Sequence, residues 1–259
     1  MRMEKVLLYQ MDSLYRDSFK IYGYHFGGNE KTVCIVGAIR GNEIQQLYMC
    51  SNLIKTLKLL EERRCLDENL GIMIVPSVNP YSLNTSTRFW ATDNTDINRM
   101  FPGYENVEVA KEFAMPYIML RNPKPYDTTT LNYEWQVWGT QAFSIYIPGT
   151  DQVDVKQARY GIDAVIRFLA YHGLIHMKVN GGYRSRIVEE NELVTVRTKT
   201  SGILVLKVKC GDHLSVGDEI AEIIDTYEGD VIEVIKSPCE GCLFYHGSNP
   251  LIYSNTAIA

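Results

Sequence analysis

The hydrophobic residues of the first 180 positions alternate between two periods. Residues 32–39 (TVCIVGAI) form a compact, β-branched apolar run, which predicts a buried strand. From position 43 to about position 64, apolar residues recur every three or four positions, which predicts an amphipathic helix. Residues 154–172 show the same helical spacing, and Gly173 is the expected C-cap. Further strands are predicted at residues 71–78, where Pro76 ends the run, at 116–121 and at 142–149.

Strands that alternate with helices imply a sheet with helices on its faces. The sequence therefore predicts an α/β domain over residues 1–181, built on a mostly parallel or mixed sheet. After Gly181 no helical spacing occurs, and short β-rich pieces are separated by glycine-containing turns. These pieces are residues 186–190, 193–200, 202–208, 219–224, 230–237, 242–247 and 250–254. We expect a second, smaller all-β domain over residues 182–259.

Composition narrows the class of protein. The 259 residues are 46% apolar and 22% charged, which is typical of a soluble globular chain. The net charge is -5 and no Lys/Arg block occurs, so nucleic acid is not an expected partner. The first residues lack the apolar core of a signal peptide, and no apolar run approaches the ~18 residues of a membrane span. We therefore expect a cytoplasmic protein without membrane contact, while composition leaves the oligomeric state undefined.

The cysteine pattern does not predict a structural metal site. Cys34 and Cys50 lie in apolar runs and are interpreted as small core residues. Cys239 and Cys242 form a CxxC pair, but a structural zinc site needs a second pair at suitable spacing, and the sequence has none. We interpret the CEGC segment as structural.

Two segments carry the candidate chemistry, because ligands of open α/β sheets bind beyond the carboxyl ends of strands. Arg40 and Glu43 follow the first predicted buried strand, and a long loop follows the second. That loop contains Asn79, Arg88, Asp96, Asn98 and Arg99. Guanidinium and amide groups converging there would suit a carboxylate ligand. Equally, Asp96 could pair with an arginine only to hold the loop.

The segments GAIRGNE, VPSVNPYSLNTSTRFW and TDINRMFPG together resemble the succinylglutamate desuccinylase/aspartoacylase family of the zinc-carboxypeptidase superfamily. The resemblance implies a carboxypeptidase-like α/β domain and a C-terminal barrel-sandwich domain. It also implies zinc-dependent hydrolysis of an N-acyl amino acid, or a related amide, with a free carboxylate. By the same resemblance Glu43 is a zinc ligand, Arg88 polarises the scissile carbonyl, and Asn98 and Arg99 bind the substrate carboxylate.

This chain departs from the family's pattern at the metal site. The family's first histidine ligand corresponds to Arg40, and the second has no counterpart. The catalytic glutamate corresponds to Tyr146, on the strand predicted at 142–149. Arginine cannot ligate a metal, and a catalytic zinc needs three protein ligands. We therefore predict an Arg40–Glu43 ion pair, and a cationic pocket with Arg88 and Arg99.

Two hypotheses follow for the activity. The chain is either a zinc hydrolase of this family, or a non-catalytic relative that binds a small anionic carboxylate ligand without zinc. The family would also place a helix and a core strand directly after the FPGY segment, where this chain continues at Glu105. Either the sheet is reduced, or further residues belong between Tyr104 and Glu105.

The segment 121–146 is rich in tryptophan and tyrosine, with Trp135 and Trp138 three positions apart. Such residues usually belong to a packed lid or an interface. Packing is the interpretation we favour for these two side chains. A wall that shapes the ligand site is the alternative.

Overall fold

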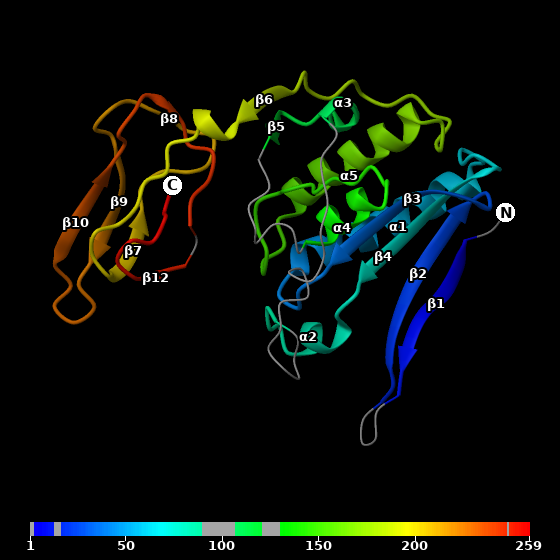
Figure 1. Cartoon of the computed structure of the whole chain (residues 1–259), viewed down its shortest axis with the longest axis horizontal. Helices are drawn as coiled ribbons and strands as arrows, with labels where there is room; N and C mark the ends of the chain where they lie inside the picture. The colour runs from blue at the N-terminus through cyan, green and yellow to red at the C-terminus, as the bar shows by residue number, and fades with distance from the viewer. Residues whose placement is uncertain (1–2, 13–16, 90–106, 121–129, 248) are drawn as a thin grey trace. The chain divides into compact units, whose positions relative to one another are not determined.

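The computed structural model describes residues 3–12, 17–89, 107–120, 130–247 and 249–259, and the chain divides into the compact units Met1–Val188 and Glu189–Ala259 (Figure 1). The division lies a few residues beyond the predicted boundary at 181/182. The first unit contains strands β1 (Glu4–Met11), β2 (Phe19–Gly27), β3 (Glu30–Ala38), β4 (Leu70–Ser77) and β5 (Tyr117–Leu120). Its helices are α1 (Ile44–Glu62), α2 (Pro80–Asn84), α3 (Val107–Ala110), η2 (Lys111–Phe113), α4 (Leu131–Val137) and α5 (Val155–Tyr171).

The main sheet of the first unit has four strands in the order β1-β2-β4-β3. Strands β1, β2 and β4 pair antiparallel, and only β3 and β4 pair parallel. The α/β class is therefore confirmed, but the sheet is mixed rather than mostly parallel. Strand β4 runs through Pro76, where the sequence predicted its end. The β1–β2 hairpin was not predicted, because almost every residue of β1 is exposed and the strand lacks the apolar alternation of a half-buried strand.

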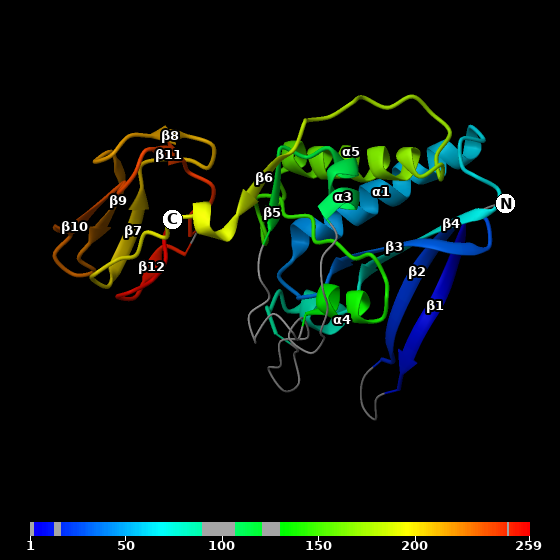
Figure 2. The same ribbon diagram turned by 45° about the horizontal axis from the view of Figure 1, so that its top comes forward.

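Helices α1 and α5 lie side by side, and both were predicted within one or two residues (Figures 1 and 2). Their apolar stripes join sheet residues in one core that includes Phe26, Leu57, Ile74 and Leu169. The carboxylate of Asp154 accepts a hydrogen bond from the backbone N–H of Gln157 at the start of α5. Within the described ranges, no helix combines the length and the apolar character that crossing a membrane requires.

The predicted strand at 142–149 is not formed, and this prediction is wrong. The apolar alternation behind it is real, because Phe143, Ile145 and Ile147 are half-buried while Ser144 and Tyr146 are exposed. A strand also needs a neighbour for its backbone groups, and among the described residues this segment pairs with none. The short helix α4 precedes it and was not predicted.

The tryptophans of this region differ in environment. Trp135 is half-buried, whereas Trp138 is 78% exposed and its indole N–H donates to Glu134. The packing interpretation therefore does not hold for Trp138.

The second unit contains the strands β7 (Gly202–Leu206), β8 (His213–Leu214), β9 (Glu219–Ile224), β10 (Val231–Lys236), β11 (Gly241–Cys242) and β12 (Leu251–Ile252). Strand β6 (Arg186–Glu189) spans the division, and η4 (Glu190–Glu192) follows it. Strands β10-β9-β7-β12 form one antiparallel sheet around a small core, and β11 pairs with β8. Residues 193–200 form no strand, apart from a single bridge between Arg197 and Ala257. All six cysteines are free; Cys50 is buried as expected, whereas Cys34 is exposed, because it alternates along β3 with Val33 and Ile35, which pack against the core, and so points to the opposite face.

Candidate functional site

The carboxyl ends of β3 and β4 meet at one edge of the main sheet. Ala38 pairs with Ser77, and the N–H of Val78 donates to the carbonyl of Ala38 at 3.1 Å. The turn 39–43 leaves β3 and α2 leaves β4, and the two segments touch. A Cβ placed on Gly41 would lie 2.1 Å from the carbonyl carbon of Ser82. Both candidate segments of the sequence therefore start from one place, as the parallel pairing requires.

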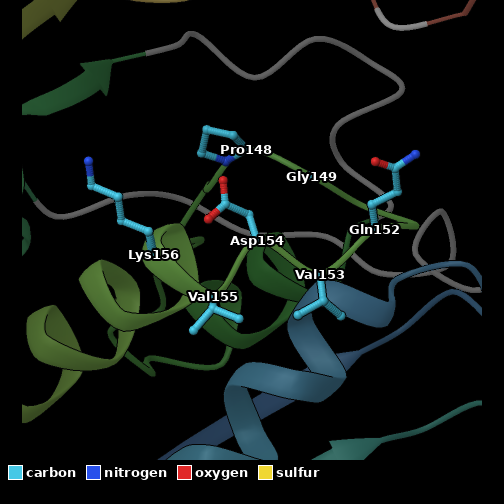
Figure 3. A pocket seen from close by; sticks show the side chains of 7 residues that line it. All are labelled: Pro148, Gly149, Gln152, Val153, Asp154, Val155 and Lys156. Atoms are coloured by element: carbon cyan, nitrogen blue, oxygen red, sulfur yellow. The ribbon is translucent and has the colours of Figure 1, made fainter.

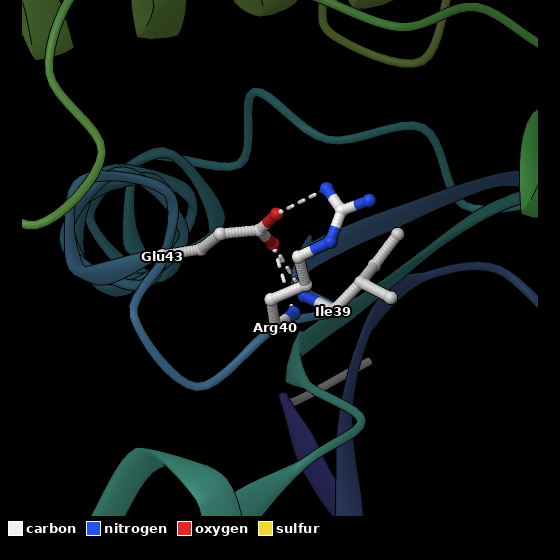
Figure 4. Close-up of polar contacts among 3 residues, drawn as sticks. All are labelled: Ile39, Arg40 and Glu43. Carbon is white, nitrogen blue, oxygen red and sulfur yellow. Dashed lines mark hydrogen bonds and ion pairs between the residues drawn. The ribbon is translucent and has the colours of Figure 1, made fainter. Parts of the chain in front are cut away.

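The carboxylate of Glu43 is held by three donors of the turn (Figure 4). Its Oε2 accepts the backbone N–H of Ile39 at 2.8 Å and that of Arg40 at 3.0 Å. Its Oε1 lies 3.3 Å from Nη1 of Arg40, so the predicted ion pair is confirmed. Both side chains are largely buried, at 15% and 14% exposure. Since charge-assisted hydrogen bonds are among the stronger ones, this arrangement fixes the start of α1 against the end of β3.

Polar residues of the segment after β4 hydrogen-bond within that segment. Asn79 is fully buried and its side chain accepts the N–H of Ser82 at 3.2 Å, which caps α2. The hydroxyl of Ser82 donates to the carbonyl of Phe89 at 2.7 Å. This contact draws the following loop back to α2. Arg88 is exposed, belongs to no ion pair within the described part of the chain, and has its guanidinium 5.7 Å from the Phe89 ring centroid.

A third segment, residues 148–154, is tied to the first turn of α1 through Gln45. This fully buried amide donates to the carbonyl of Asp154 and accepts its N–H, each at 3.0 Å. The backbone N–H of Gln45 also donates to the carbonyl of Thr150. A pocket lined by Pro148, Gly149 and Gln152–Lys156 lies at the start of α5 (Figure 3). Sequence analysis missed Gln45, because a glutamine in the first turn of an amphipathic helix normally faces water.

Of the remaining predicted site residues, the structure describes only Tyr146. Tyr146 is 85% exposed and lies between Ile145 and Ile147, which turn toward the protein. Asn98 and Arg99, together with Asp96, lie outside the described residues. Among the described candidates, the structure therefore brings Arg40 and Glu43 into contact with each other.

The residues present do not fit the zinc site that the resemblance implies. Arg40 carries no lone pair for a metal, and both oxygens of Glu43 already accept hydrogen bonds. All five histidines lie in the described ranges, and nowhere in those ranges do three His, Cys, Asp or Glu side chains form a possible metal site. His172 and His176 pair with single carboxylates instead, at 2.5 Å from Glu112 and 3.1 Å from Asp67.

One family model matches the part of the chain that contains the 39–43 turn and α2. Residues 29–114 match the model of the succinylglutamate desuccinylase/aspartoacylase catalytic domain. No curated protein matches the sequence.

Solved structures share the fold at low sequence identity. A succinylglutamate desuccinylase from Silicibacter sp. has a TM-score of 0.80 at 14% identity, with 99% of this chain and 93% of that chain covered. The product-bound ectoine utilization protein EutE (DoeB) from Ruegeria pomeroyi has a TM-score of 0.78 at 13% identity, with the same two coverages. A succinylglutamate desuccinylase/aspartoacylase from Rhodobacter sphaeroides has a TM-score of 0.73 at 16% identity, covering 93% and 88%. The chain therefore resembles the succinylglutamate desuccinylase/aspartoacylase catalytic domain over residues 29–114 and shares the fold of these solved structures.

Proposed function

We propose that this chain is a non-catalytic relative of the succinylglutamate desuccinylase/aspartoacylase family and binds a small carboxylate ligand without zinc. One observation carries the proposal: the Glu43 carboxylate is taken up by the Ile39 and Arg40 N–H groups and by the Arg40 guanidinium. To bind Glu43, a metal ion would have to displace the Arg40 guanidinium, whose positive charge is permanent, from the only acidic residue of the 39–43 turn. Loss of the metal removes the means of acidifying a water molecule.

The carboxylate-binding residues of the proposal are Arg88, Asn98 and Arg99. Arg88 supports it directly, because its guanidinium is exposed and is not used in an ion pair of the described chain. A guanidinium can donate two parallel hydrogen bonds to a carboxylate. For Asn98 and Arg99, the support is the resemblance to the family's motif alone. Arg40 contributes positive charge, although its pairing with Glu43 makes it a weaker candidate for ligand contact.

The second candidate function is zinc-dependent hydrolysis of an N-acyl amino acid or a related amide. It is favoured by the match of residues 29–114 to the catalytic domain, which contains Glu43 and Arg88. It requires a set of metal ligands that includes Glu43, and therefore a rearrangement of the Arg40 turn. Under this alternative Tyr146 would replace the catalytic glutamate, on the family's pattern.

Calorimetric titration with succinate and with L-glutamate tests the proposal. We expect at least one of these probes to bind, and Arg88→Ala and Arg99→Ala each to weaken binding by about 10- to 100-fold. This range corresponds to about 1.5–3 kcal/mol for a hydrogen bond to a charged group. Arg63→Ala is the matched control, since Arg63 is exposed at the opposite end of α1 from Glu43. Unchanged binding in both pocket variants, or no binding of either probe, would count against a carboxylate site here.

We also infer that the second unit is a small barrel-sandwich of the kind found in this family. The antiparallel sheets β10-β9-β7-β12 and β11-β8 support this class. The β9–β10 turn carries Tyr227 and no lysine, so an attached swinging-arm cofactor is not expected there.

A further inference from the structure

The four-stranded sheet of the second unit, β10-β9-β7-β12, has one face in the core and one face open to solvent (Figure 1). Strand β7 shows both faces. Leu204 packs in the core, while Ile203 and Val205 on either side of it are exposed, because successive side chains of a strand point to opposite faces. The outward positions of an antiparallel sheet usually carry polar residues, and here they are apolar.

Strand pairing joins these outward residues across the sheet. Ile203 pairs with Leu251 of β12 and with Ile224 of β9, and Ile224 pairs with Val231 of β10. Paired residues share a face, so they form one row, and a second row lies beside it. The open apolar face formed by both rows consists of Ile203, Val205, Ile224, Val231, Val234 and Leu251. Apart from the half-buried Ile224, these side chains are 40% to 57% exposed, and contiguous exposed apolar surface marks an interaction site.

Negative charge without a counter-ion lies at one end of the open apolar face. The β9–β10 turn connects Ile224 to Val231, and it carries Asp225, Glu228 and Asp230 but no Lys or Arg. Within the described residues, none of these three carboxylates forms an ion pair. A partner that covers the open apolar face therefore meets three uncompensated acids at this end.

The other charges of the face are paired within the unit. Glu222 lies between Val205 and Val234 in the second row, and its carboxylate is 2.5 Å from Nζ of Lys207. The same ammonium group is 2.6 Å from Glu219. Residues 189–259 as a whole contain twelve Asp or Glu and five Lys or Arg. This surplus of acids disfavours both a second copy of the unit and an anionic membrane as the partner, because like charges repel.

We propose that the open apolar face docks an amphipathic helix of another protein, with Lys or Arg residues at the end that lies over the β9–β10 turn. Helices commonly cover an apolar sheet face, as α1 and α5 do in the core of the first unit. Four strands about 4.8 Å apart span about 14 Å, and a helix with its side chains is about 10–12 Å wide. One helix therefore fits the face, and its basic end would neutralise the acids of the turn.

Fluorescence anisotropy with two labelled model helices tests the proposal on the full chain. Each helix has 18 residues with one leucine face and one glutamine face; the first carries four lysines at one end, and the second carries four glutamates there. We expect the lysine helix to bind at least about 10-fold more tightly than the glutamate helix. The double variant Glu228→Lys/Asp230→Lys should reverse this preference.

A second pair of variants locates the binding surface. Ile203→Lys places a charge in the middle of the open apolar face and should weaken binding of the lysine helix at least about 10-fold. Val216→Lys adds the same charge at an exposed position outside the four strands, and it is the matched control. Circular dichroism checks that each variant is folded.

Three results would overturn the proposal. Neither helix could bind at chain concentrations up to about 200 µM, which would exclude a helix partner of this kind. Ile203→Lys and Val216→Lys could weaken binding equally, which would place the binding surface elsewhere. A dimer that Ile203→Lys alone dissolves in sedimentation equilibrium would assign the open apolar face to a second copy of the chain.

Discussion

Replacing Glu43 by alanine should lower the free energy of unfolding by about 3 kcal/mol. The substitution leaves the Ile39 and Arg40 N–H groups without their acceptor and leaves a largely buried guanidinium without its counter-charge. A hydrogen bond to a charged group contributes about 1.5–3 kcal/mol, and breaking one side of a buried ion pair costs about 3–5 kcal/mol. The three contacts share one carboxylate, so their contributions do not add. Urea denaturation followed by circular dichroism measures the change.

Two further variants make this result interpretable. Glu43→Gln keeps the shape and one acceptor oxygen but removes the charge, so we expect roughly half of the alanine effect. Glu62→Ala at the far, exposed end of α1 should change the free energy of unfolding by less than about 0.5 kcal/mol. A Glu43→Ala variant as stable as the Glu62→Ala control would mean that the Glu43 carboxylate does not hold this turn.

Gly41→Ala should destabilise the protein by about 3 kcal/mol or more. The added Cβ would lie 2.1 Å from the carbonyl carbon and 2.2 Å from the carbonyl oxygen of Ser82. Overpacking a tight contact usually costs about 1–3 kcal/mol, and here both sides of the contact are backbone, which cannot move aside like a side chain. The turn after β3 and the start of α2 would have to separate. Thermal unfolding gives the change in stability.

The matched control for this second variant is Gly181→Ala in the same unit. A Cβ on Gly181 would meet no atom within 4 Å, so the substitution should change stability by less than about 0.5 kcal/mol. Equal effects of the two alanines would contradict a close packing of Gly41 on Ser82. Because the Cβ would push the 39–43 turn away from α2, which Arg88 follows in the chain, the Gly41→Ala variant should also weaken carboxylate binding.

The sequence carried enough information for the two long helices and for the position of the Arg40–Glu43 turn at the end of β3. The 3.6-residue period of residues 44–62 and 155–171 determines which helix face is buried. This period is visible in the local sequence without knowledge of distant contacts. The ion pair between Arg40 and Glu43 was also predictable, because the two opposite charges lie three positions apart in one tight turn. Each of these features depends on neighbours in the sequence.

The features that sequence analysis missed depend on distant parts of the chain. Strand pairing decides that β3 is an edge strand and that only one pair of the main sheet is parallel. The apolar alternation around Tyr146 resembles a strand, but a local pattern cannot reveal that no neighbouring strand is there. The role of Gln45 depends on Asp154, more than one hundred residues away. Only the folded backbone brings these groups together.

Elemental analysis for zinc decides most directly between the two functions. The purified full chain is incubated with excess zinc chloride, freed of unbound metal by gel filtration, and measured by mass spectrometry beside Glu43→Ala. Since Arg40 cannot ligate a metal and forms an ion pair with Glu43, we predict well below one zinc per chain, with no difference between the two proteins. One zinc per chain in the original protein, lost in Glu43→Ala, would contradict the metal-free site.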